Sequence, residues 1–130
     1  MAPTSKSGAL RKAIGLANSR LKTNVQNADK LLSTKTMGLD SDACQEFAYD
    51  VTEITARIKA CISTLTEKDE HWLTLIARLD DIVVTVEKEF YTKVAVDSPR
   101  GYMVTIEEAK ETICQLERKV NDANFKEQFA

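Results

Sequence analysis

Apolar residues recur every three or four positions along most of the chain, which is the spacing of one face of an α-helix. A first helix is predicted over about 8–35, and a last helix over about 103–125, where Thr105 and Glu108 form a capping box. No long run alternates apolar and polar residues, so strands are not expected. The stripe of the first helix consists of Leu10, Ile14, Ala17, Leu21, Val25, Ala28 and Leu32.

The middle of the chain carries the most regular pattern. Neither Gly nor Pro occurs from Leu39 to Ser98, and Asp40, Ser41 and Asp42 offer side-chain oxygens for an N-cap. One apolar row has a strict seven-residue period: Cys44, Val51, Ile58, Leu65, Trp72, Leu79 and Val86. This row favours one long helix of about 42–94. The polar run 64–70 is the alternative boundary, where the helix would split in two.

These elements predict an all-α protein, an elongated antiparallel helical bundle or coiled coil, with three long helices or four if the middle one splits. Residues 1–130 are expected to form one domain, with 1–7 as a disordered tail. Three long helices would leave thin two-helix layers whose apolar surface a second copy would cover, so a homodimer or higher oligomer is expected. A split would instead favour a monomeric four-helix bundle.

The seam of the middle helix supplies the candidate interface. Trp72 continues its row and is expected to anchor the core, or to serve as an interaction hot spot. The expected partner is a second copy of the chain or another helical protein. The candidate interface residues are Phe47, Val51, Ile54, Ile58, Leu65, Trp72 and Leu79.

Composition adds few constraints to this picture. With 130 residues, 43% hydrophobic and 29% charged, the chain belongs to the folded globular class. Its three cysteines, Cys44, Cys61 and Cys114, form no CxxC or Cys/His pattern, which predicts neither a disulfide framework nor a zinc site. No signal-like or membrane-spanning apolar stretch occurs, so an intracellular location, cytoplasmic or nuclear and reducing, is expected.

The net charge of −2 conceals an asymmetry between the two parts of the chain. Residues 1–36 contain seven Lys and Arg against one Asp, a charge of +6, which leaves −8 for the remainder. The first helix is therefore a candidate contact for nucleic acid or an anionic membrane. The alternative is that this face is solvated or pairs with the acidic remainder. The candidate basic residues are Arg11, Lys12, Arg20, Lys22 and Lys30.

No arrangement of residues indicates catalysis. His71 is the only histidine, and the neighbours Asp80 and Asp81 point about 100° apart on a helix, so they do not readily share a metal or a proton. Neither a GxGxxG nor a GxxxxGK[ST] phosphate loop occurs. We therefore expect no enzyme activity, no cofactor, no metal and no small-molecule substrate.

The order of the helical motifs resembles a known family. The motifs are Leu10-Arg-Lys-Ala-Ile14, Val51-Thr-x-Ile54-x-x-Arg57-Ile58, His71-Trp72-x-x-x-Ile76-x-x-Leu79-Asp80, Glu87-x-Glu89-x-Tyr91 and Ile106-Glu-x-Ala109-x-Glu111-x-Ile113-x-x-Leu116-Glu117. They are similar to the N-terminal helical region of gag-like polyproteins of Bel/Pao-type LTR retrotransposons. This resemblance implies a non-enzymatic structural module for self-assembly. A host protein derived from such an element, or an adaptor that docks a partner helix, fits the same pattern.

Overall fold

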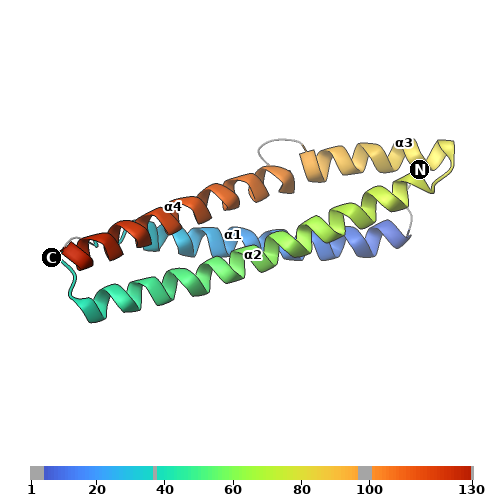
Figure 1. The fold of residues 1–130 in the computed structure, drawn as a ribbon. Coiled ribbons are helices and arrows are strands. Elements are labelled where there is room, and N and C mark those ends of the chain that lie inside the picture. Colours follow the sequence, from blue (N-terminus) through green and yellow to red (C-terminus); the bar gives the residue numbers. More distant parts are fainter. Residues whose placement is uncertain (1–4, 37, 97–100, 130) are drawn as a thin grey trace.

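The computed structural model describes residues 5–36, 38–96 and 101–129 (Figure 1). It contains the helices α1 (Ser5–Leu32), α2 (Ser41–Ala77), α3 (Asp81–Tyr91) and α4 (Tyr102–Phe129), and a short π-helix, η1 (Thr92–Val96). The described residues include no strand. The prediction of an all-α helical bundle is confirmed.

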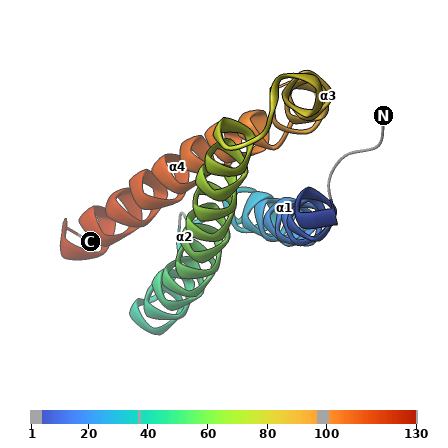
Figure 2. The same cartoon turned by 90° about the vertical axis from the view of Figure 1, so that its right-hand side faces the viewer.

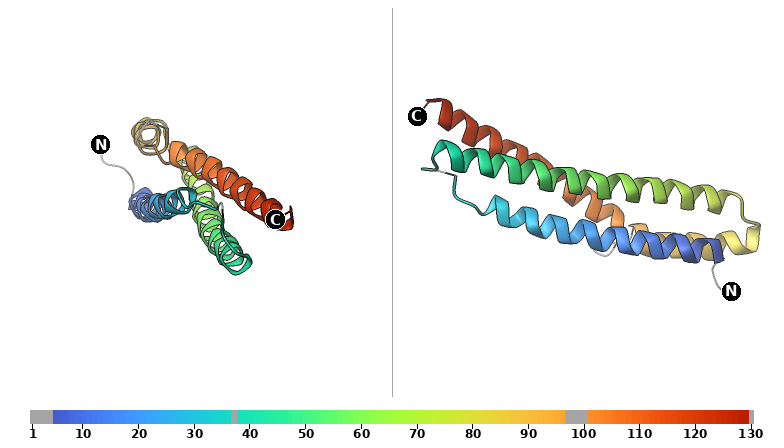
Figure 3. Two further views of the ribbon diagram at one scale, coloured as in Figure 1. Left: turned by 90° about the vertical axis from the view of Figure 1, so that its left-hand side faces the viewer. Right: turned by 90° about the horizontal axis from the view of Figure 1, so that it is seen from below.

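The helices form three rods. Helices α1 and α2 run antiparallel and pack against each other over most of their length, as Figures 1 and 3 show. Helix α3, η1 and α4 follow one another and together form the third rod. Figure 1 shows that α3 lies beside the half of the bundle where α1 begins and α2 ends, while α4 lies along the other half. Figure 2 views the rods from the α3 end.

Side chains define the ends of α1 and α2. The Asp40 carboxylate accepts a hydrogen bond from the Ala43 backbone N–H at 2.8 Å, so the predicted cap at the start of α2 is present. At the end of α1, the Lys119 ammonium of α4 donates to the Leu32 carbonyl at 2.6 Å. A cation at this position also interacts favourably with the helix dipole.

Residues 5–7, which were expected to belong to a disordered tail, are part of α1. Helix α1 begins at Ser5. Ser7 is completely buried, and its hydroxyl forms a hydrogen bond with a residue of α3. Residues 1–4 lie outside the described part of the chain.

The prediction for the middle helix was wrong in two respects. Helix α2 does not reach residue 94. It ends at Ala77, and the chain turns at 78–80 before α3 begins. It also does not split at 64–70, where it continues without interruption. Within that run Leu65 is buried, Lys68 and Asp69 are half-buried, and the remaining residues are exposed. The helix therefore keeps its packing face through the polar run.

The turn at 78–80 has a physical reason. A helix over 42–94 would be roughly 80 Å long at 1.5 Å per residue, whereas α1 spans only about 42 Å, so its last turns would have no helix to pack against. Asp80 adopts extended backbone geometry, φ −74° and ψ 167°, and serves as the N-cap residue of α3. Folding back places α3 against Trp72 instead of in solvent.

The apolar rows predicted from the sequence make up most of the core. The α2 row is buried from Cys44 to Trp72, and Leu79, at the turn, is half-buried. Beyond the turn, Val86 of the row is only half-buried, and the fully buried position of α3 is its neighbour Glu87. The main core residues of α1 and α4 are Ile14, Ala17, Leu21, Ala28, Ile106, Ala109, Ile113 and Leu116.

Gly101 allows η1 and α4 to approach closely. A Cβ atom on Gly101 would lie 2.6 Å from the Ala95 carbonyl oxygen and 2.8 Å from the Val96 carbonyl carbon. Both are backbone atoms, so no side-chain rotation relieves the clash. The close approach leads into Tyr102, which is completely buried.

We predict that Gly101→Ala lowers the free energy of unfolding by about 1–3 kcal/mol, the usual cost of overpacking. Urea unfolding followed by circular dichroism measures the change. Gly15→Ala is the matched control, because a Cβ there has no neighbour within 4 Å and alanine favours the helix. Equal stability of the Gly101→Ala variant and the wild type would contradict this account.

Candidate functional site

The candidate interface residues of α2 lie inside the chain's own core. Phe47, Val51, Ile54, Ile58, Leu65 and Trp72 are all buried, and only Leu79 is half-exposed. Their partners are residues of the same chain. This row is therefore occupied within one copy, and a site for a partner has to be sought elsewhere on the surface.

Three polar side chains join the third rod to α2. The Asp69 carboxylate oxygen Oδ1 accepts hydrogen bonds from the hydroxyl of Tyr91 at 2.6 Å and from that of Tyr102 at 2.5 Å. Tyr91 is the last residue of α3, and Tyr102 is the first residue of α4. One carboxylate of α2 thus holds both sides of the junction between them.

The environment of these tyrosines favours their neutral form. Burial, together with the hydrogen bond and the charge of Asp69, raises the pKa of Tyr91 to about 12. The same causes raise the pKa of Tyr102 well above its ordinary range. Both hydroxyls therefore remain protonated near neutral pH and donate their hydrogen bonds to Asp69.

A second buried polar group lies beside the junction. Glu87 of α3 is completely buried and accepts hydrogen bonds from the Ser7 hydroxyl at 2.6 Å and from the Trp72 indole N–H at 3.1 Å. The Trp72 ring meets the Tyr91 ring edge-on, with centroids 5.3 Å apart. These contacts connect α1, α2 and α3 at one end of the bundle.

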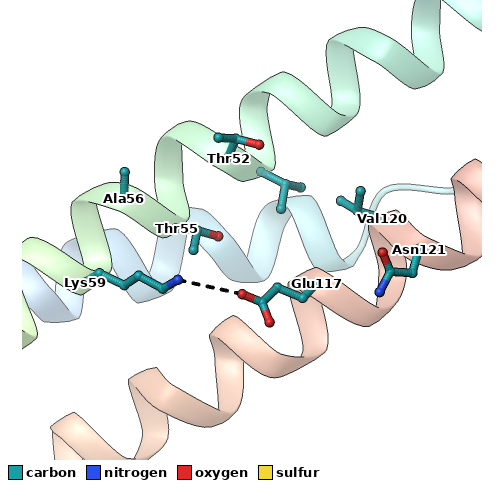
Figure 4. Close-up of a pocket in the computed structure, with 8 residues that line it drawn as sticks. Thr52, Thr55, Ala56, Lys59, Glu117, Val120 and Asn121 are labelled. Carbon is teal, nitrogen blue, oxygen red and sulfur yellow. Dashed lines mark ion pairs between the residues drawn. The ribbon is translucent and has the colours of Figure 1, made fainter.

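The α2–α4 groove is a surface hollow between two helices (Figure 4). Its volume is about 380 Å³. Lys59 of α2 and Glu117 of α4 face each other across it at 3.8 Å, and both side chains are more than half exposed. The residues that line the groove are Val51, Thr52, Thr55, Ala56, Lys59, Glu117, Val120 and Asn121.

Thr55 is the unusual residue of the α2–α4 groove. The residue is 9% exposed, and its hydroxyl oxygen is buried with no hydrogen-bond partner. Helical threonines usually donate to the carbonyl four residues earlier, as Thr52 does to Ala48 at 2.9 Å. A buried hydroxyl without a partner costs about 1–3 kcal/mol. The α2–α4 groove therefore contains an unmet hydrogen-bonding group.

The α1–α2 cleft is a second hollow, with a volume of about 410 Å³. Arg20 of α1 and Arg57 of α2 both line it, and no acidic residue does. Asn24 donates from its amide to the Cys61 sulfur at 3.6 Å across the two helices. Its charge distinguishes this cleft from the α2–α4 groove, where a cation and an anion are balanced.

The five candidate basic residues do not form one surface. Arg11 is half-buried: its guanidinium lies over the Phe90 ring, 4.8 Å from the centroid, and its Nε donates to the Ser7 carbonyl. Lys12, Arg20, Lys22 and Lys30 are exposed and form no ion pair with any described residue. Arg11 therefore attaches α1 to α3, and only the other four remain available to an anion.

The three cysteines and His71 differ in their exposure to solvent. Cys44 is buried, Cys61 is half-buried and Cys114 is exposed, and all three thiols are free. His71 is exposed on α2. Across the part of the chain that the structure describes, no three His, Cys, Asp or Glu side chains are placed to hold a metal ion.

Comparison with known proteins adds no further assignment. No family model, curated protein or solved structure matches the chain significantly. Within the described ranges, no helix is both long enough and apolar enough to span a membrane.

Several of these residues were missed from the sequence. Thr55 follows Val51 by four residues and precedes Ile58 by three, so it occupies a helix position where an apolar residue would pack. Asp69 has the same relation to Leu65 and Trp72. A polar residue at such a position was the available signal. The sequence does not show whether such a residue has a hydrogen-bond partner, because the partner comes from other helices.

We predict that stability falls as the pH rises from about 10 to about 12. The pKa of Tyr91 in the folded state lies above its ordinary value of 10.0, so the folded chain holds this proton more tightly than the unfolded chain does. The stabilisation is complete below the pKa that Tyr91 has in the unfolded chain. It is lost as the pH rises past the pKa that Tyr91 has in the folded chain. Urea unfolding at a series of pH values measures the slope.

The slope should become shallower in Tyr91→Phe and shallower still when Tyr102→Phe is added. Tyr49→Phe is the control, because Tyr49 is 68% exposed. The same slope in the wild type and in the double variant would refute the role assigned to these hydroxyls.

Proposed function

We propose that this chain is a non-enzymatic self-assembly module, and that two copies associate through their α2–α4 grooves. The proposal extends the sequence resemblance to gag-like helical regions, which implies the same kind of role. It places the contact on a different surface from the α2 seam, whose residues are already buried within one copy.

The buried hydroxyl of Thr55 is the observation that carries the proposal. This hydroxyl lines the groove without a hydrogen bond, so a polar group of a partner in the groove would supply one. The half-buried Val120 contributes apolar surface to the same groove, so a partner would also cover apolar area. Thr52 and Ala56 are exposed and small, which allows another helix to approach α2 closely.

A second copy is the occupant that the chemistry favours. In a dimer with two-fold symmetry, both copies use the same surface, so this surface must be complementary to itself. Lys59 and Glu117 meet this requirement, because each copy's ammonium can approach the other copy's carboxylate. A threonine hydroxyl both donates and accepts, as does the Asn121 side-chain amide. The groove thus offers on one copy what it needs from the other.

We predict a concentration-dependent dimer by light scattering coupled to size-exclusion chromatography. Ala56→Arg should raise the dimer dissociation constant more than about tenfold, because a long cation would replace a methyl group at the contact. Ala60→Arg is the matched control: Ala60 is also exposed on α2 but lines the α1–α2 cleft. Its dimer should resemble that of the wild type.

Thr55→Val separates association from folding. Removing the unpaired hydroxyl should raise the stability of the monomer by about 1 kcal/mol and at the same time weaken the dimer. Lys59→Glu and Glu117→Lys should each weaken it, and the double variant should restore it. A monomer mass at all concentrations, or a dimer indifferent to Ala56→Arg, would overturn the proposal, and binding of another protein's helix in the same groove would favour the adaptor.

A further inference from the structure

The α1–α2 cleft has a composition that the self-assembly proposal does not use. It faces away from the α2–α4 groove on α2, since Ala60 and Cys61 line the cleft whereas Ala56 and Lys59 line the groove. The residues that line the cleft are Ser19, Arg20, Thr23, Asn24, Arg57, Ala60 and Cys61. Its polar atoms come from two guanidinium groups, two hydroxyls, an amide and a thiol.

The two arginines retain free hydrogen-bond donors. Arg20 is exposed and forms no ion pair with a described residue. Arg57 pairs with Glu53 through one nitrogen, Nη2, at 2.5 Å. A guanidinium has five N–H donors, so Arg57 can still bind an anion through the others. Glu53 does not line the cleft.

The hydroxyl groups of the cleft are also available. Ser19 and Thr23 lie one turn apart on α1, and neither hydroxyl has a hydrogen bond to a described residue. Asn24 is held in place by its contact with Cys61. The cleft therefore combines two positive charges with several N–H and O–H donors and no competing carboxylate on its walls.

We propose that the α1–α2 cleft binds a phosphate group, as carried by a phosphate monoester. A phosphate dianion presents three terminal oxygens, and planar guanidinium groups recognise such oxygens in pairs. Arg20 and Arg57 would bind from the two helices, and the hydroxyls of Ser19 and Thr23 would donate from α1. No bond is made or broken, so this is a binding site and not a catalytic one.

The other cations of α1 favour a single phosphate group over an extended polyanion. Lys12 and Lys30 are 18 residues apart, which is five helical turns and roughly 27 Å, so they lie on one side of α1. Arg20 is eight residues from Lys12 and therefore about 80° away around the helix. The lysines do not converge on the cleft, whereas Arg20 and Arg57 do.

The test is a titration of the full chain with phenyl phosphate, followed by two-dimensional NMR at constant ionic strength. Saturable shifts are expected for the signals of residues 19–24 and 57–61. Arg20→Gln and Arg57→Gln should each weaken binding about tenfold or more, as for loss of a charge-assisted hydrogen bond. Lys22→Gln, which removes an exposed cation of α1 outside the cleft, should change it less than about twofold.

Further ligands identify what is recognised. Inorganic phosphate binding with the same dependence on Arg20 and Arg57 would show that the phosphate group itself is the ligand. A single-stranded oligonucleotide whose binding depends on Lys12 and Lys30 as strongly as on Arg20 would overturn the proposal in favour of an extended polyanion surface. Shifts that do not saturate, or equal losses in Lys22→Gln and Arg20→Gln, would overturn it as well.

This test is independent of the dimer. Arg20 and Arg57 do not line the α2–α4 groove, so their variants should keep the oligomeric state of the wild type. Failure of self-association would leave the phosphate titration unchanged.

Discussion

The carboxylate of Asp69, on α2, accepts hydrogen bonds from Tyr91 at the end of α3 and from Tyr102 at the start of α4. Without this acceptor, the hydroxyls of the half-buried Tyr91 and the buried Tyr102 would lose their partner at the point where the third rod is interrupted. Trp72 also has a polar group that needs a partner: its indole N–H donates to Glu87, while its ring packs against Tyr91. Paired polar groups, buried or half-buried, thus connect the helices at one end of the bundle.

The helices could be predicted from the sequence more easily than the points where they end. The repeat of three and four residues located α1, most of α2 and α4, because a core face must be apolar at that spacing whatever it packs against. The seven-residue row could not locate the turn at 78–80, since the helix ends there without Gly or Pro. Tertiary packing determines where α2 ends. Helix α1 is too short to pack against a longer α2, and α3 contacts Trp72 because the chain folds back.

The same reasoning applies to the two surface hollows. The basic character of α1 was visible in the sequence, but the meeting of Arg20 with Arg57 depends on the register between α1 and α2. Likewise Lys59 and Glu117 are ordinary surface residues until α4 is placed beside α2. Most of the candidate interface residues on the α2 seam are buried within one copy for a related reason: the third rod and α1 together cover that seam.

The account depends on Asp69 as the acceptor that joins α3 and α4 to α2, and hydrogen exchange of backbone amides in Asp69→Leu tests this most directly. Asp50→Leu, at an exposed position of the same helix, is the control. The account predicts faster exchange throughout α3 and in the first turns of α4, with the centres of α1 and α2 still protected. Unchanged protection of α3 and α4 in Asp69→Leu would contradict it.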